Sequence, residues 1–113
     1  MRTPMVAGNW KMNLTNPEAV ALVRELLAAP VTGKGCEVVV CPPFTALGEV
    51  ALVLSGTAIR LGAQNLYWEP SGAFTGEVSA AQLRSVSCAY VIVGHSERRW
   101  VFGEDDAAVG RKT

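Results

Sequence analysis

Four short apolar runs recur along the chain, separated by longer segments with mixed polarity. They are Met5–Gly8, Val38–Cys41, Ile59–Ala63 and Ala89–Val93. The second and fourth runs are continuous rather than alternating and are rich in β-branched residues. That pattern is typical of strands buried on both faces of a parallel sheet. The hydrophobic pattern therefore predicts four strands, of which the second and fourth are expected to be buried on both faces.

The segments between these runs carry helical patterns. Thr15–Glu18 provides capping side chains, a proline and an acid for a first helix, whose apolar stripe reaches Leu27. Further helices are expected from Thr45 to Leu54, from a capping box at Ser79–Gln82, after Ser96, and from about Asp105 to the end. Strands and helices thus alternate without a hairpin signal. The pattern predicts an α/β fold of four consecutive βα units with parallel strands, in one domain over residues 1–113.

Two features differ from a closed small domain. The connection Gln64–Val78 is long, lacks periodicity and holds apolar residues that look exposed: Leu66, Tyr67, Trp68 and Phe74. Such loops are usually functional, and we prefer an interface arm to an ordered surface loop. The last helical segment is short, and four βα units leave open strand edges. We therefore expect the chain to be part of a larger fold.

The composition excludes several classes. The chain is 50% apolar and 18% charged, with ten basic and ten acidic residues and a formal net charge of zero. The sequence has no basic cluster that would indicate nucleic-acid binding. It also shows neither a membrane-spanning helix nor a signal peptide, so we expect a cytoplasmic protein. Three cysteines without CxxC spacing (Cys36, Cys41 and Cys88) predict neither disulfides nor a zinc site.

Polar side chains follow the first and fourth predicted strands. Asn9 and Lys11 come after the first strand and have the same alternating phase, so both could face one pocket. A cation and an amide suit an anionic ligand or a developing oxyanion. A loop lysine with a capping asparagine is the alternative. His95, the single histidine, follows the fourth strand and would lie at the same edge of the sheet.

His95 directly precedes the helix that Ser96 begins. Backbone N–H groups at that helix end would favour a neutral imidazole that donates a hydrogen bond. A structural histidine is the alternative. Glu97 could accept from Lys11 or from the backbone as a supporting acid, and Arg98 and Arg99 could anchor acids such as Glu77 or Glu104.

Three stretches resemble the triosephosphate isomerase family: "GNWKMN", "AQNLYWEPSGAFTGEVS" and "VGHSERRWVFGE", collinear from about residue 4 onward. The resemblance implies half of a (β/α)8 barrel. It also implies that Asn9 and Lys11 bind substrate, that Lys11 balances negative charge, and that His95 polarises the carbonyl and shuttles protons. Ser96 and Glu97 would support them. The neutral active-site histidine is a described feature of this family, so our expectation for His95 is not independent of it.

The resemblance implies interconversion of dihydroxyacetone phosphate and glyceraldehyde 3-phosphate through an enediolate, without metal or organic cofactor. It places Phe74, Thr75, Gly76 and Glu77 at the interface of a homodimer, with Thr75 near the partner's active site. The glutamate base and the lid loop belong to the other half of the family barrel, so we expect little turnover from this chain alone. Two alternatives stay open. One is a non-catalytic module that assembles with a complementary C-terminal half or another copy, and the other is simple anion binding by Asn9 and Lys11.

Overall fold

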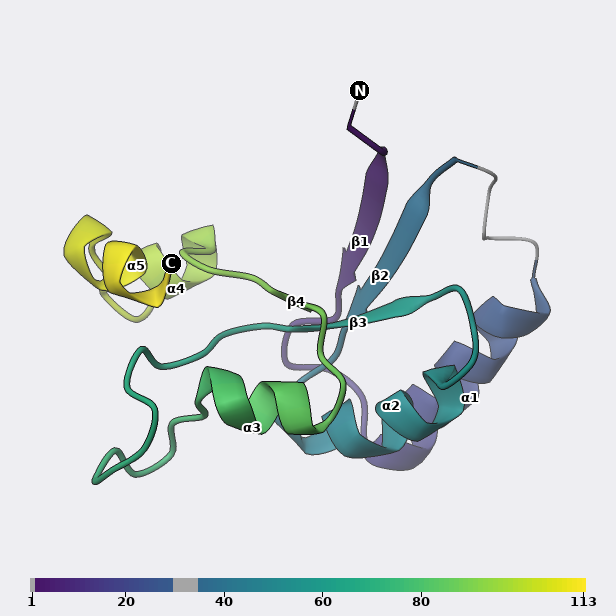
Figure 1. Ribbon diagram of the computed structural model, residues 1–113, viewed down its shortest axis with the longest axis horizontal. Helices are drawn as coiled ribbons and strands as arrows, with labels where there is room; N and C mark the ends of the chain where they lie inside the picture. Colours follow the sequence, from purple (N-terminus) through teal and green to yellow (C-terminus); the bar gives the residue numbers. More distant parts are fainter. Residues whose placement is uncertain (1, 30–34) are drawn as a thin grey trace.

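The computed structural model describes residues 2–29 and 35–113. Strands and helices alternate along the chain as expected (Figure 1). In order, the elements are β1 (Met5–Asn9), α1 (Asn16–Ala28), β2 (Glu37–Cys41), the 3-10 helix η1 (Phe44–Ala46), α2 (Leu47–Leu54), β3 (Arg60–Ala63), α3 (Ala80–Ser85), β4 (Tyr90–Val91), α4 (Ser96–Trp100) and α5 (Asp106–Lys112).

The four strands form one parallel sheet in the order β1-β2-β3-β4. The β1–β2 pairing runs from Met5 opposite Glu37 to Asn9 opposite Cys41, whereas each later pair of strands shares two residues on each side. Figure 1 shows the sheet curling strongly between β1 and β3. Because all strands are parallel, their carboxyl ends meet at one edge. The fold is half of a (β/α)8 barrel, which confirms the predicted class.

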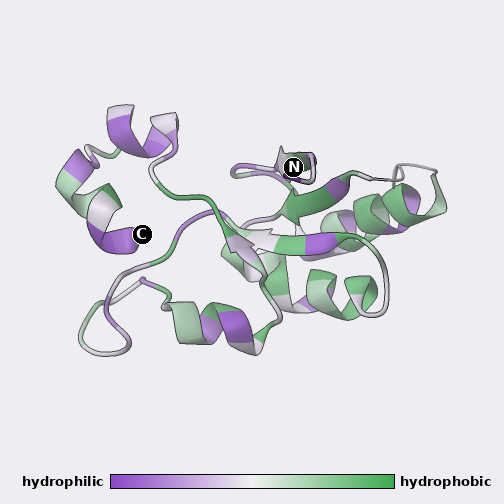
Figure 2. Ribbon diagram, turned by 45° about the horizontal axis from the view of Figure 1, so that its top comes forward, coloured by the Kyte–Doolittle hydropathy of each residue, from purple (hydrophilic) through white to green (hydrophobic). Residues whose placement is uncertain are grey.

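The core lies between the sheet and the helices on one side of it. Figure 1 shows α1, α2 and α3 together on that side, and α4 and α5 beyond the end of β4. Val23 of α1, Val50 of α2 and Leu61 of β3 are buried in one apolar cluster, and α2 packs against both α1 and β3. Figure 2 shows α4 mainly in the colours of hydrophilic residues.

The predicted capping box at Ser79 is present, and the capping side chains predicted at Thr15–Glu18 also form a capping box. The Thr15 backbone N–H donates to Glu18 Oε1 at 3.0 Å, at the start of α1. At the start of α3, the Ser79 N–H donates to Gln82 Oε1 at 2.9 Å, and Ser79 Oγ accepts from the Gln82 N–H at 3.2 Å. These bonds serve backbone donors that a helix leaves without partners.

Three expectations are wrong in detail. The fourth apolar run forms a strand of only two residues, and Tyr90 and Val91 are half-buried rather than buried on both faces. The Thr45–Leu54 segment begins as η1, so its α-helix starts at Leu47. Leu66, which looked exposed, is 8% exposed because it joins the core. Burial depends on which elements cover a residue, and the local pattern does not specify that.

No helix among the described residues is long and apolar enough to cross a membrane.

Candidate active site

The carboxyl edge of the sheet holds the residues that the sequence singled out. Asn9 ends β1, Lys11 follows it, and His95 and Glu97 lie at the start of α4. These four side chains line one hollow of about 410 Å³, together with apolar groups such as Phe44. The structure therefore brings the predicted site residues together, as the carboxyl ends of parallel strands should.

The loop after β1 is a tight turn rather than the extended segment that the sequence suggested. Lys11 has a φ of 58°, and its backbone N–H donates to Asn9 Oδ1 at 2.9 Å. Asn13 Nδ2 donates to the Trp10 carbonyl at 2.8 Å. Asn9 thus acts on the backbone of the lysine turn while still facing the hollow.

Gln64 was not predicted as a functional residue. It directly follows β3, and its Nε2 donates to the Lys11 carbonyl at 2.9 Å and to the Cys41 carbonyl at 2.8 Å. It also lines the hollow. The signal that could have identified Gln64 was its position at the carboxyl end of a strand, which it shares with Asn9, but its hydrogen-bond partners are distant in sequence.

Lys11, Glu97 and His95 form a chain of contacts. Lys11 Nζ lies 3.4 Å from Glu97 Oε2, which confirms the predicted approach of these two groups. Both side chains are about half-exposed, at 52% and 47%, so this pair orients the lysine more than it stabilises the fold.

The His95 ring has two competing contacts at Nδ1. The Glu97 backbone N–H donates to it at 3.1 Å, and Glu97 Oε1 lies 3.4 Å away. The carboxylate contact would need a proton on Nδ1, whereas the backbone bond needs a lone pair there. We favour the backbone bond, because it is shorter and belongs to the amino end of α4, where N–H groups lack partners. Nε2 then carries the proton of a neutral ring.

Arg98 and Arg99 hold acids of the C-terminal segment. Arg98 Nε lies 3.0 Å from Glu104 Oε2, which is one of the pairings that the sequence suggested. Arg99 Nη1 lies 2.6 Å from Asp106 Oδ1. Glu77, the other acid considered, is instead exposed in the loop before α3. The two arginines therefore tie α4 to the segment that leads into α5.

Glu104 also binds a lysine that the sequence did not reveal. Lys112 Nζ lies 2.7 Å from Glu104 Oε2 and donates to Asn65 Oδ1 at 2.9 Å. Burial alone would raise the pKa of Glu104, but hydrogen bonds from Lys112 and Arg98 and their positive charges hold that pKa below its usual value. This cluster joins α5 to the segment after β3.

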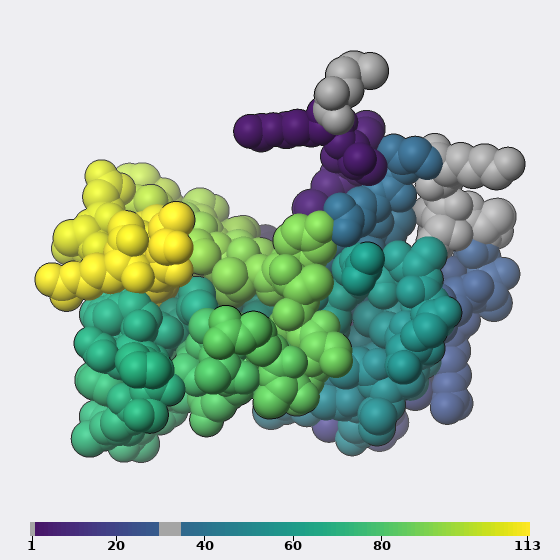
Figure 3. Space-filling model, in the orientation of Figure 1, coloured from purple at the N-terminus to yellow at the C-terminus, as the bar shows by residue number. Residues whose placement is uncertain are grey.

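The long loop of residues 64–78 closes on itself. The Tyr67 N–H donates to the Val78 carbonyl at 2.8 Å, and the Tyr67 ring packs against Trp68 and Phe74 with centroid distances of 4.2 and 4.6 Å. Arg111 of α5 lies over Trp68, and Figure 3 shows α5 in yellow above this loop. Phe74 is 38% exposed, and the neighbouring tip residues Thr75, Gly76 and Glu77 are exposed.

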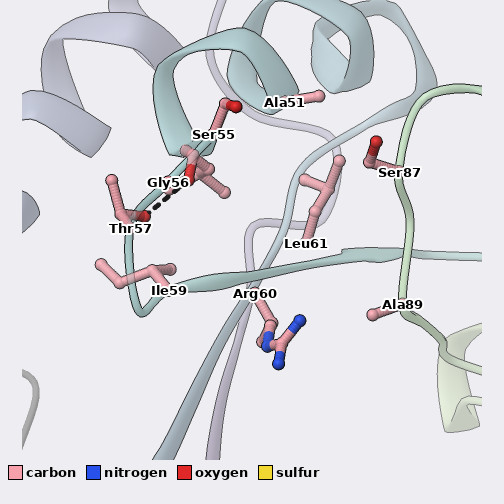
Figure 4. A pocket seen from close by; sticks show the side chains of 10 residues that line it. Ala51, Ser55, Gly56, Thr57, Ile59, Arg60, Leu61, Ser87 and Ala89 are labelled. Carbon is pink, nitrogen blue, oxygen red and sulfur yellow. Dashed lines mark hydrogen bonds between the residues drawn. The ribbon is translucent and has the colours of Figure 1, made fainter.

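A second hollow of about 260 Å³ lies at the opposite edge, where β3 and β4 begin (Figure 4). Thr57 Oγ1 donates there to the Leu54 carbonyl at 2.7 Å, along the dashed line. Arg60 is the one ionisable group among the described residues that line it. Without an acid–base pair, this hollow is a weaker candidate than the one at the carboxyl edge.

Within residues 2–29 and 35–113, no three His, Cys, Asp or Glu side chains gather closely enough to hold a metal ion. A reaction without metal or organic cofactor stays a prediction.

The chain forms a parallel half-barrel, and polar side chains from several strand ends surround one hollow. This arrangement is typical of the class of (β/α)8-barrel proteins. Comparison with known proteins specifies the family. The model of the family "Triosephosphate isomerase" matches residues 4–113. The chain is 57% identical over 112 residues to triosephosphate isomerase of Symbiobacterium thermophilum, 54% identical over 112 residues to that of Pelobacter propionicus, and 56% identical over 113 residues to that of Endomicrobium trichonymphae.

These alignments cover 99–100% of the chain and 44–45% of the relatives, so the chain spans less than half of their length. The chain belongs to the triosephosphate isomerase family.

Proposed function

We propose that this chain supplies one half of a triosephosphate isomerase active site. The reaction is the interconversion of dihydroxyacetone phosphate and D-glyceraldehyde 3-phosphate through an enediolate, in the cytoplasm. The observation that carries the proposal is the convergence of Asn9, Lys11, His95 and Glu97 on one hollow at the carboxyl edge of the sheet. Membership of the triosephosphate isomerase family supports this particular reaction.

His95 would polarise the substrate carbonyl. With Nδ1 accepting from the Glu97 N–H, Nε2–H is the donor that can reach a carbonyl oxygen and later exchange a proton with it. A neutral ring suits this task because it donates without placing a fixed charge in the site.

Lys11 would balance the charge of the phosphate and the enediolate, and Asn9 would assist in substrate binding. Among the described residues, Lys11 Nζ contacts Glu97 Oε2 at 3.4 Å and the lysine side chain is half-exposed, so its ammonium group is free to meet an anion. Glu97 and Ser96 would support the site, since Glu97 restrains the lysine and Ser96 begins the helix beneath His95.

Proton abstraction from carbon needs a base within hydrogen-bond reach of the substrate. Glu97 is the carboxylate among the described residues that line the hollow, and it already contacts Lys11 and His95. In the family, the glutamate base and the lid lie in the other half of the barrel. We therefore expect the 113-residue chain alone to turn over little substrate.

The test mixes this chain with the C-terminal half of the Symbiobacterium thermophilum relative and measures isomerase activity. We expect activity from the mixture, and about a 100-fold or greater loss with His95→Gln or Lys11→Met in this chain. Arg24→Met is the control, because Arg24 is exposed on α1, away from the hollow. Activity that survives His95→Gln would refute the assigned role, and near-normal activity of the chain alone would refute the half-site.

The loop of residues 64–78 would form the interface of a homodimer. In the family, this loop inserts into the neighbouring subunit, and here its exposed tip carries Phe74, Thr75, Gly76 and Glu77. The aromatic stack beneath the tip gives it a defined shape before any partner binds. Thr75→Arg should therefore reduce association of the assembled barrel in analytical ultracentrifugation, whereas Arg84→Thr on α3 should not.

A second candidate function is that of a non-catalytic assembly module. Its support is the surface that the half-barrel leaves uncovered. Met5 and Val6 of the edge strand β1 are 46% and 61% exposed. The chain exposes 7395 Å², whereas a compact monomer of 12.0 kDa is expected to expose about 6,000 Å². That excess of about 1,400 Å² is larger than the roughly 800 Å² that each partner buries in an interface of standard size.

The complementary half of the barrel is the partner that fits this surface, because it would pair with both β1 and β4 and cover their apolar residues. Light scattering with and without that half tests this function. A one-to-one complex without isomerase activity would favour the non-catalytic assembly module over the half-site of an enzyme. Two species that stay separate would count against both proposed functions.

A further inference from the structure

The Gln64 side chain joins three segments of the site. Its single Nε2 group carries two hydrogens, and the two bonds that it donates go to the Lys11 carbonyl at 2.9 Å and to the Cys41 carbonyl at 2.8 Å. The Cys41 carbonyl also accepts the Trp10 N–H at 3.1 Å. One amide therefore connects the ends of β2 and β3 with the turn that carries Lys11.

That turn holds a conformation that a lysine does not favour by itself. The φ of Lys11 is 58°, in the left-handed region that residues with a side chain rarely adopt. Such a residue persists when its surroundings determine its conformation. At Lys11, the surroundings act on both sides of the residue: Asn9 Oδ1 accepts from the Lys11 N–H, and Gln64 Nε2 donates to the Lys11 carbonyl.

We propose that Gln64 is a positioning residue, which holds the Lys11 turn so that the ammonium group meets the anionic part of the substrate. The inference rests on the proposed function for one point, namely that the ligand of Lys11 is the anionic part of the substrate. Gln64 acts through the backbone of Lys11, and no contact between Gln64 and substrate is required. A glutamate, although of the same size, cannot replace it, since an ionised carboxylate only accepts and would face two carbonyl oxygens.

The test compares the 113-residue chain with its Gln64→Glu and Gln64→Met variants. Gln82→Glu is the matched control, because Gln82 Oε1 accepts from the Ser79 N–H and a glutamate performs the same capping role. Lys11→Ala reports whether the site binds anions at all. The readouts are the backbone amide NMR spectrum without ligand, the dissociation constant for glycerol 3-phosphate, and the urea midpoint.

We expect Gln64→Glu to shift the amide resonances of residues 9–13 and to weaken glycerol 3-phosphate binding by about tenfold. Gln64→Met should act in the same direction with a smaller effect, since it removes the donors without adding a charge. Gln82→Glu should change neither readout. A purely structural role would lower the urea midpoint while the folded fraction still bound the ligand with the original constant.

Two results would overturn the inference. The first is a Gln64→Glu spectrum in which residues 9–13 keep their resonances. The second is a dissociation constant equal to that of the parent chain while Lys11→Ala weakens binding. If Lys11→Ala leaves binding unchanged, the anion site of the proposed function is wrong, and the spectrum of the turn alone decides whether Gln64 holds it.

Discussion

Replacing Glu104 by glutamine tests whether a buried ion pair fastens the last helix to the sheet. The carboxylate is 5% exposed and lies 2.7 Å from Lys112 Nζ, which is itself 6% exposed. Arg98 Nε lies 3.0 Å from the same oxygen. Glutamine keeps the size of the side chain but removes the charge, so packing is preserved while both charge-assisted bonds weaken.

The magnitude follows from the burial of the lysine. Removing one partner of a buried ion pair costs about 3–5 kcal/mol, because the other charge is left without compensation. Lys112 keeps its bond to Asn65 Oδ1, and the glutamine oxygen can still accept, so we place the loss in the free energy of unfolding at about 3 kcal/mol. Glu104 Oε1 has no hydrogen-bond partner among the described residues, so an amide placed there gains nothing.

Urea denaturation followed by circular dichroism measures this loss. Glu49→Gln is the matched control, since Glu49 is exposed and its Oε1 accepts from Asn16 Nδ2 at 3.0 Å, which glutamine can also do. We expect the control to change the free energy of unfolding by no more than about 0.5 kcal/mol. Equal effects of Glu49→Gln and Glu104→Gln would refute the reasoning.

The same pair predicts a dependence on pH. The pKa of Glu104 is lower in the folded chain than in the unfolded chain, so its contribution is fully present above the unfolded pKa of about 4.3. It is lost as the pH falls through the folded pKa. The stability difference between the parent chain and Glu104→Gln should therefore be constant near neutral pH and narrow below about pH 4.

Two further predictions concern the packing around the sheet. Gly94→Ala should lower the free energy of unfolding by about 2–4 kcal/mol, because φ is 65° and an added Cβ would lie 2.8 Å from Val109 Cγ1. Gly48→Ala, in open space on α2, should instead raise it slightly in the same urea assay. Burial and the neighbouring Cys41 raise the pKa of Cys88 to about 11, so iodoacetamide should alkylate it about a hundredfold more slowly at pH 8 than in the unfolded chain. Equal rates would contradict the raised pKa.

Much of the fold was predictable because its signals are local. The capping boxes at Thr15 and Ser79 link residues three positions apart, and the apolar runs of the strands are continuous in sequence. The meeting of Asn9, Lys11 and His95 also followed from the sequence, since parallel strands deliver their carboxyl ends to one edge. The roles of these residues stay predictions.

The sequence by itself determined the order of the βα units, their caps and the edge of the sheet that carries the site. The tertiary structure decided what depends on distant partners. Gln64 reaches Lys11 across 53 positions, and Lys112 reaches Asn65 across 47. It also decided that β1 stays exposed and Leu66 does not, because burial depends on which elements cover a residue, while a pattern of hydrophobic positions records only the local backbone geometry.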